Sequence, residues 1–224
     1  MPLDAGEHRR ERLRRARLYL ALEAQPGSKP AEEILREALA GGVDMVQLRD
    51  KHASDEELLR AAALFRRVCQ EHGALFWVND RPDLALDAGA DGVHVGQEDM
   101  PVAEVRDLVG PDVLIGLSTH TSDQFATGLA SAADQLSVGP VFDTPTKAGR
   151  PATGLGLIRH AAAAGTNAAW FAIGGIDTTT VHDVAAAGAT RAVVVRAIRD
   201  ALDPRSAAGE LREALERRPV GAAQ

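Results

Sequence analysis

Cationic and amide side chains gather at the end of one short apolar run. The segment Gln47-Leu48-Arg49-Asp50-Lys51 closes an expected β-strand at 45–49. Alternation in a strand places Gln47 and Arg49 on one face, and Lys51 continues that line just past the end. A bidentate arginine, a lysine and an amide together suit a diphosphate. The alternative interpretation is a salt-bridged strand end, with Arg49 paired to Asp50.

Acidic residues follow the next two apolar runs. Asp80 comes directly after Asn79 at the end of the run 75–79, and Asp99 follows the run 92–95. Each precedes a helical pattern that begins near a proline, so each one alone fits a helix cap. Two carboxylates at the same end of adjacent strands are also what Mg²⁺ commonly receives from a protein, with phosphates and water as its other ligands. The pair therefore predicts that Asp80 and Asp99 hold Mg²⁺.

Hydroxyl groups and another lysine follow two later runs. Ser118 ends the run 114–118, where its hydroxyl can bind a phosphate oxygen or another substrate group. His120 fits a structural role at least as well as a catalytic one, and no neighbouring carboxylate indicates a triad with Ser118. The loop after the sixth run contains Thr144-Pro145-Thr146-Lys147. It is long for its place, and long loops in compact domains are often functional, so we expect it to bind an anion.

These segments follow short apolar runs that alternate with helical patterns. The expected strands are 17–22, 45–49, 75–79, 92–95, 114–118, 135–141, 170–173 and 192–195. The expected helices are 30–40, 54–72, 82–88, 101–109, 122–130, 155–164, 178–187 and 206–217. Repeated strand–helix units indicate a parallel sheet. They predict an α/β fold with a single domain, a (β/α)8 TIM barrel at 16–218, with a flexible N-terminal tail at 1–15 and a C-terminal tail at 219–224. A doubly wound sheet is the alternative.

The last two strand ends lie where such barrels bind phosphate. Active sites of barrels lie at the C-terminal strand ends, and backbone N–H groups of the seventh and eighth loops often hold phosphate. Gly174-Gly175 follows the seventh expected strand, and glycine permits a close approach of the backbone. Val195 and Arg196 end the eighth. We therefore expect phosphate near Gly175, Val195 and Arg196, although a glycine pair alone would fit any turn.

Composition and charge narrow the class of protein. Of 224 residues, 45% are hydrophobic and 25% charged, as in a globular protein with a core. The net charge of −7 argues against a nucleic acid or an anionic membrane as partner, since both require a broad basic face. Cys69 is the only cysteine, which fits the reducing cytoplasm. No apolar run is long enough to span a bilayer. The oligomeric state is left open, a homo-oligomer included.

Taken together, the motifs resemble those of the thiamine-phosphate synthase family. The resemblance extends from the second expected strand to the eighth, and the motifs occur in the family's order and spacing. They are Gln47-Leu48-Arg49-Asp50-Lys51, Val78-Asn79-Asp80, Gly96-Gln97-Glu98-Asp99, Gly116-Leu117-Ser118-Thr119-His120-Thr121, Gly139-Pro140-Val141-Phe142 with Thr144-Pro145-Thr146-Lys147, and Ile173-Gly174-Gly175-Ile176.

The resemblance implies a reaction and a site. Hydroxymethylpyrimidine diphosphate and a thiazole phosphate would combine to give thiamine phosphate and diphosphate, with Mg²⁺ as cofactor. The pyrimidine diphosphate would contact Gln47, Arg49, Lys51, Asn79, Ser118 and Lys147, of which Arg49, Lys51, Ser118 and Lys147 would be catalytic. The thiazole phosphate would contact Thr144, Thr146, Gly175, Val195 and Arg196. The neighbouring motif residues Leu48, Asp50 and Pro145 are included in the predicted binding site.

One position departs from the family pattern, and two other functions compete. Many family members carry serine where this chain has Arg196, so the contacts on the thiazole side are open. Thiazole tautomerases, a related branch on the same barrel, would use a histidine near His120 and need no diphosphate site. A catalytically silent phosphate-binding barrel would not require Mg²⁺. The diphosphate motif and the acidic pair favour the synthase.

Overall fold

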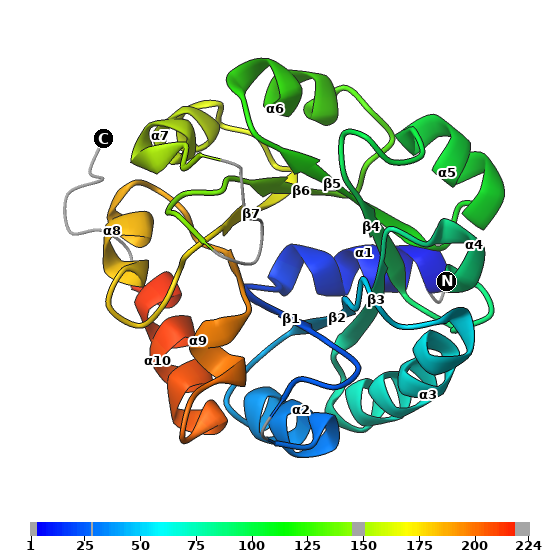
Figure 1. Cartoon of the computed structure of the whole chain (residues 1–224). Coiled ribbons are helices and arrows are strands. Elements are labelled where there is room, and N and C mark those ends of the chain that lie inside the picture. The colour runs from blue at the N-terminus through cyan, green and yellow to red at the C-terminus, as the bar shows by residue number, and fades with distance from the viewer. Residues whose placement is uncertain (1–3, 28, 145–150, 218–224) are drawn as a thin grey trace.

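Parallel strands form a closed barrel in the computed structural model, which describes residues 4–27, 29–144 and 151–217 (Figure 1). The strands are β1 (Leu18–Leu22), β2 (Met45–Leu48), β3 (Leu75–Asn79), β4 (Gly92–Val95), β5 (Leu114–Thr119), β6 (Gln135–Val138), β7 (Ala169–Ile173) and β8 (Ala192–Val194). Each pairs with its neighbour in sequence, and β8 pairs back to β1, with Ala192 opposite Leu18. This closure confirms the predicted (β/α)8 barrel and excludes the doubly wound sheet.

The alternation of side chains in each strand separates two cores. In β1, Tyr19 and Ala21 belong to the cluster inside the barrel, while Leu18, Leu20 and Leu22 belong to the cluster between strands and helices. All five residues are buried, because a strand covered by helices on one side and by other strands on the other has no solvent-exposed face. The polar residues that point inward near the strand ends are therefore held in a rigid frame.

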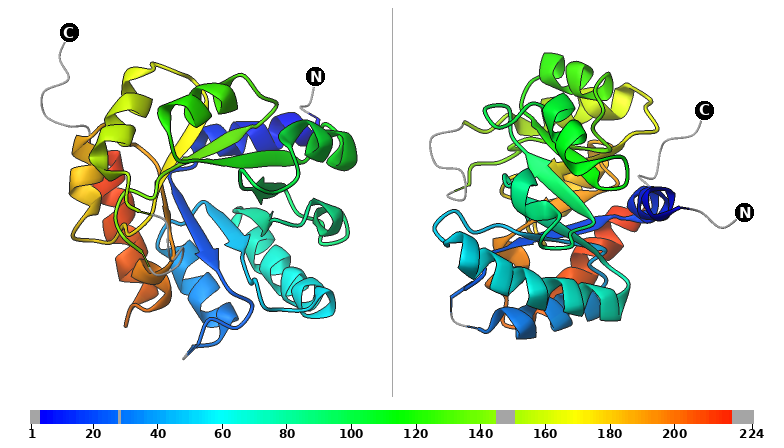
Figure 2. Two further views of the ribbon diagram at one scale, coloured as in Figure 1. Left: turned by 45° about the horizontal axis from the view of Figure 1, so that its top comes forward. Right: turned by 90° about the vertical axis from the view of Figure 1, so that its right-hand side faces the viewer.

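Helices surround the barrel and connect its strands (Figures 1 and 2). They are α2 (Ala31–Ala40), α3 (Asp55–His72), α4 (Pro82–Ala85), α5 (Val102–Val109), α6 (Ser122–Leu129), α7 (Gly154–Ala163), α8 (Val181–Ala186), α9 (Arg196–Arg199) and α10 (Pro204–Glu216). A capping box formed by Ser54 and Glu57 begins α3, and Gly73 ends it in the left-handed conformation. The short α9 was not expected, because Arg196 to Arg199 is too brief to show a helical period.

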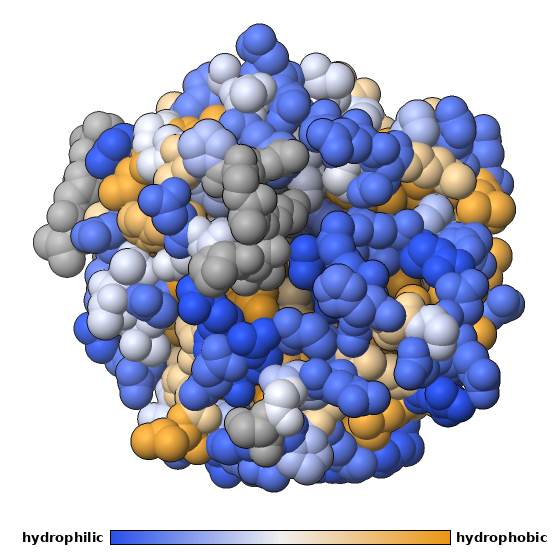
Figure 3. Space-filling model, in the orientation of Figure 1, coloured by the Kyte–Doolittle hydropathy of each residue, from blue (hydrophilic) through white to orange (hydrophobic). Residues whose placement is uncertain are grey.

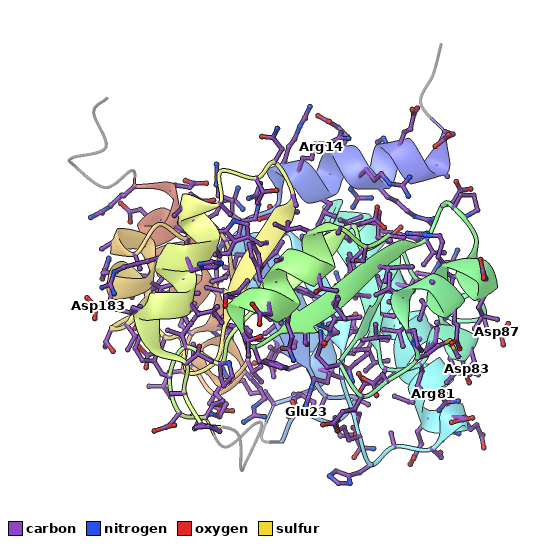
Figure 4. All side chains as sticks on the ribbon, turned by 90° about the horizontal axis from the view of Figure 1, so that it is seen from above. Arg14, Glu23, Arg81, Asp83, Asp87 and Asp183 are labelled. Carbon is purple, nitrogen blue, oxygen red and sulfur yellow. The ribbon has the colours of Figure 1, made fainter. Side chains whose placement is uncertain are left out.

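Residues 5–15 form a helix, which corrects that part of the predicted flexible tail at 1–15. Helix α1 (Ala5–Arg15) begins at Asp4, whose side chain accepts a hydrogen bond from the Glu7 N–H. Arg9 pairs with Asp91, and Arg10 pairs with Asp134, each at 2.8 Å. The charges that suggested a solvated tail instead bind acidic residues at the N-terminal end of the barrel, across which α1 lies (Figure 4).

Two further sequence predictions concern the chain ends and the membrane. The predicted C-terminal tail at 219–224 lies outside the described residues. Within the described part of the chain, no helix is long and apolar enough to cross a membrane.

Candidate active site

A cavity of about 650 Å³ opens at the C-terminal ends of the strands. Figure 3 shows this face of the molecule, where hydrophilic residues surround a central hollow. The strands bring the predicted residues to it because each motif directly follows a strand, and parallel strands end on the same side. The cavity is lined by the predicted residues Gln47, Arg49, Lys51, Asn79, Asp80, Asp99, Ser118, Thr144, Gly175, Val195 and Arg196.

Other predicted site residues lie elsewhere. Leu48 is only 1% exposed and packs in the core between strands and helices, because it alternates with Gln47. The Asp50 carboxylate accepts hydrogen bonds from the backbone of His52 and Ala53, so it shapes a turn outside the cavity. These two residues are corrections to the predicted binding site. Three predicted residues lie outside the described residues, namely Pro145, Thr146 and Lys147.

The side chains that follow β2 form one cationic wall of the cavity. The Gln47 amide donates a 2.8 Å hydrogen bond to the hydroxyl of Tyr19, which is buried inside the barrel. Arg49 lies one alternation further on, and in the described part of the chain it makes no ion pair, so the alternative pairing with Asp50 is not observed. The Lys51 ammonium lies 3.3 Å from the Asp80 carboxylate. The wall therefore presents the Arg49 guanidinium, which pairs with no carboxylate among the described residues, beside the Lys51 ammonium, which faces Asp80.

Asp80 and Asp99 lie together at the ends of β3 and β4. Asp80 has a φ of 58°, which is uncommon for a residue other than glycine, and its N–H donates to the His94 carbonyl at 2.8 Å. Burial raises the pKa of Asp80, and the neighbouring Asp99 carboxylate raises it further, while Lys51 opposes the change. Asp99 also accepts a 2.7 Å hydrogen bond from the Gly96 N–H.

The acidic pair fits a divalent cation. The Asp99 carboxylate raises the pKa of Asp80 because two ionised carboxylates at close range repel, and a bound cation would relieve that repulsion. No cluster of three or more acidic, histidine or cysteine ligands occurs among the described residues. The two carboxylates of Asp80 and Asp99 suit Mg²⁺, which commonly takes one or two carboxylates and completes its coordination with phosphates and water.

An ionic cluster holds the segment that carries Asp80. The Arg81 guanidinium contacts Asp55 at the start of α3 at 2.5 Å and Asp83 in α4 at 2.6 Å. These contacts raise the pKa of Arg81, the larger cause being the hydrogen bond to Asp55. Arg81 thereby joins two helices immediately beside the unusual backbone of Asp80.

The loops after β6 and β7 pack closely on each other. Gly174 and Gly175 have φ values of 103° and 65°. A Cβ at Gly174 would lie 2.5 Å from the Pro140 Cα, and one at Gly175 would lie 2.7 Å from the Phe142 Cβ. Glycine is therefore required at both positions by conformation and by space. Thr144 follows this close contact in sequence and lines the same cavity as Gly175.

Arg196 begins α9 just after β8, the strand adjacent to β7, and is exposed. Two carboxylates near it in the cavity lining, Asp177 and Asp200, interact with other residues. Asp177 accepts hydrogen bonds from Thr179 and Thr180, and Asp200 pairs with Arg199 at 2.6 Å. Within the described residues, no ion pair involves Arg196, so its charge faces the cavity without a carboxylate bound to it.

Several lining residues were not among the predicted contacts. They are Tyr19, Ala21, His94, Gln97, Glu98, His120, Ser137 and Ile173. Strand alternation would have found Tyr19, His94 and Ser137, which share the inward face with predicted residues on their own or neighbouring strands. His120 had been left open between a structural and a catalytic role, and its Nδ1 lies 2.5 Å from the Gly139 carbonyl oxygen. Because that oxygen can only accept, this contact assigns the proton to Nδ1 and gives His120 a structural contact at the cavity.

Comparisons with known proteins agree with one another. A family model described as thiamine monophosphate synthase matches residues 18–198. A thiamine-phosphate synthase from Mycobacterium sp. (strain KMS) is 48% identical over 212 residues, covering 91% of this chain and 94% of that protein. One from Streptomyces avermitilis is 48% identical over 207 residues, covering 92% and 96%. The solved structure of a thiamine phosphate pyrophosphorylase from Pyrococcus furiosus has a TM-score of 0.81 at 33% identity, covering 92% and 97%.

Proposed function

Because the chain belongs to the thiamine monophosphate synthase family, we propose that it joins hydroxymethylpyrimidine diphosphate to a thiazole phosphate, with Mg²⁺ bound, and releases diphosphate. The observation that carries this proposal is the convergence of Arg49, Lys51 and the Asp80–Asp99 pair on one cavity. A tautomerase has no use for cations and metal-binding carboxylates at the same wall.

The departing diphosphate is the group that this wall is suited to stabilise. In the proposed reaction the bond between the pyrimidine methylene carbon and the diphosphate oxygen breaks first, and the aminopyrimidine spreads the resulting positive charge. The thiazole nitrogen then forms the new bond to that carbon. Arg49 and Lys51 meet the negative charge as it develops on the diphosphate, which is usually the largest contribution to catalysis. No protein nucleophile is required.

Lys51 has two candidate partners, the Asp80 carboxylate and the diphosphate of the substrate. An exchange of the first for the second would fit the proposed order of substrate binding and bond breaking. Without substrate its ammonium pairs with Asp80 at 3.3 Å. Asp80 and Asp99 would hold Mg²⁺, which would supply Lewis-acid stabilisation of the phosphate oxygens. The Lys51 ammonium would then be available to the diphosphate. Lys147 would join it from the loop after β6.

The thiazole phosphate is expected on the side of the cavity formed after β7 and β8. The backbone at Gly175 would approach the phosphate closely, Thr144 lines the same cavity, and Arg196 would add a charge from the end of the adjacent strand β8. Holding the two substrates in line supplies much of the remaining rate enhancement, because it removes the entropic cost of their encounter.

The test is direct synthesis. The purified chain is incubated with both substrates and Mg²⁺, and thiamine phosphate and diphosphate are measured together. Equal amounts of the two products support the proposal. Conversion of a thiazole isomer without use of the pyrimidine diphosphate would support the tautomerase instead, and binding of phosphate without turnover would support a silent barrel.

A further inference from the structure

Polar side chains are buried inside the barrel directly beneath the cavity. His94 of β4, Ser118 of β5, and Gln135 and Ser137 of β6 are all buried, and none is more than 6% exposed. The interior of such a barrel is normally filled by branched apolar residues, and a buried polar group is costly unless it is hydrogen-bonded. Four of them in contact on three adjacent strands therefore indicate a specific role.

The hydrogen bonds among these residues have a defined direction. The Gln135 side-chain oxygen lies 3.1 Å from His94 Nδ1, and the Gln135 amide nitrogen donates to the Ser137 hydroxyl at 3.0 Å. An amide oxygen can only accept, so this contact assigns the proton to Nδ1. The other ring nitrogen, Nε2, then carries a lone pair and accepts the Ser118 hydroxyl proton at 2.9 Å.

Gly116 is what lets His94 reach Gln135. Gly116 of β5 is opposite His94 on one side and opposite Gln135 on the other, so the three residues share one level of the barrel. A Cβ at Gly116 would lie 2.3 Å from His94 Nδ1 and 2.5 Å from the Gln135 oxygen. The missing side chain therefore leaves a slot in which a hydrogen bond passes across β5 from β4 to β6.

From this geometry we infer that His94 is a positioning residue, which Gln135 holds through the Gly116 slot and which fixes the Ser118 hydroxyl for contact with the pyrimidine substrate. The inference rests on the proposed function, in which Ser118 contacts that substrate. With its proton engaged by Nε2, Ser118 turns the lone pairs of its oxygen toward the cavity. His94 also borders the cavity, so the alternative is that it touches the substrate itself.

Two substitutions at His94 separate its two hydrogen bonds. The amide of His94→Asn reaches only as far as Nδ1, so it keeps a partner for Gln135 and loses Ser118. The amide oxygen of His94→Gln reaches the place of Nε2, so it keeps an acceptor for Ser118 and loses Gln135. Both variants carry a neutral amide in the same buried site, and circular dichroism and melting temperature check that both are folded.

The decisive measurement is a double-mutant cycle on kcat, with the KM of each substrate measured alongside. We expect His94→Asn to lower kcat by about 10- to 100-fold, since a small misplacement of a contact group costs up to about 10²-fold, and His94→Gln to retain most of it. In a Ser118→Ala background the kcat values of the two His94 variants should differ by less than about 3-fold. The reason is that both substitutions act through the Ser118 hydroxyl, which is already absent, so their effects on kcat do not add to its loss.

Three outcomes would overturn the inference. If the fold-reductions in kcat caused by His94→Asn and by Ser118→Ala multiply in the double variant, His94 acts on the substrate directly. Equal kcat values for His94→Asn and His94→Gln, both folded, would show that the hydrogen bond to Ser118 is not used. An inactive wild-type chain would instead contradict the proposed function, and with it the role of Ser118 on which this inference depends.

Discussion

At the scale of single residues, the cavity combines charges of both signs at close range. The Asp80 carboxylate lies beside Asp99 and 3.3 Å from the Lys51 ammonium, so three charged groups share one rim. Such an arrangement is costly unless ligands complete it, because each charge loses water as the cavity fills. The proposed metal ion and diphosphate would together balance these charges, and each charged residue can be tested separately.

The first prediction concerns the acidic pair. Asp80→Asn and Asp99→Ala should each lower activity by about 10²-fold or more, since a metal ion contributes several kcal/mol and 1.36 kcal/mol is about tenfold. Asparagine is chosen at position 80 because it tolerates the positive φ of 58°. Activity is titrated against Mg²⁺, with the exposed Asp87→Ala as control. Full wild-type activity in EDTA would contradict the metal assignment.

The second prediction concerns the leaving group. Lys51→Ala should lower kcat/KM by about 10²-fold, the order of loss when one preorganised contact to a developing charge is removed. Lys147→Ala should behave in the same way. The control is Lys29→Ala, because among the described residues the Lys29 ammonium donates to the backbone carbonyls of Ala201 and Leu202, away from the cavity lining. Steady-state kinetics with wild-type values for Lys51→Ala would remove this residue from the diphosphate site.

The third prediction concerns Arg196, the departure from the family pattern. Arg196→Ser should raise the KM for the thiazole phosphate while kcat and the pyrimidine KM change little, which is typical of lost uniform binding. The structure already places Asp177 and Asp200 in other interactions. A lower melting temperature with both KM values unchanged would show that the arginine is structural, and its phosphate role would be abandoned.

At the scale of elements, the site depends on the ion pairs that hold the segment between the end of β3 and the start of α4. Asp80 holds an uncommon backbone conformation, and such conformations persist only where the surroundings impose them. Arg81, the next residue, ties α3 and α4 together through Asp55 and Asp83. The contacts of Arg81 therefore hold Asp80 in the position from which it would bind the proposed metal ion.

The fourth prediction follows from that fastening. Arg81→Gln should weaken Mg²⁺ binding by about 10- to 100-fold, the usual effect of removing a group that orients a metal ligand. The matched control is Arg60→Gln, which removes an exposed pair with Glu56 within α3. The measurement is the Mg²⁺ concentration that gives half-maximal rate. An equal response of the two variants would mean that Arg81 does not support Asp80.

At the scale of the whole molecule, the barrel is closed at one end and open at the other. Helix α1 crosses the N-terminal end, while Glu23, which follows β1, lies at the opposite end (Figure 4). Asp134 lies at the sealed end, where it pairs with Arg10 and Arg106 and accepts from the Ile115 N–H. Stability and catalysis are thus placed at opposite ends, as is general in such barrels.

The fifth prediction tests that separation. Arg10→Met should lower the free energy of unfolding by about 1–3 kcal/mol, because it leaves the mostly buried Asp134 without one charged partner. Arg14→Met, which removes only an exposed pair with Glu11, should cost no more than about 1 kcal/mol. Urea denaturation gives both values. Neither variant should change either KM, and a changed KM for Arg10→Met would show that the two ends are coupled.

The sequence alone determined the barrel and most of the cavity wall, because both depend on local periods. Apolar runs separated by helical patterns indicate a parallel sheet, and alternation places Gln47 and Arg49 on one face of β2. Because every motif follows a strand, its residues had to meet at one end of the barrel. The Mg²⁺ ligands and the substrate contacts remain predictions, which the first four experiments address.

Only the tertiary structure decided which groups touch across strands far apart in the sequence. The docking of α1 depends on Arg9 and Arg10 meeting Asp91 and Asp134, more than eighty residues away. The contact between His94 and Gln135 depends on the register that brings both opposite Gly116. No local pattern encodes such a register, because it is set by how all the strands close into one barrel.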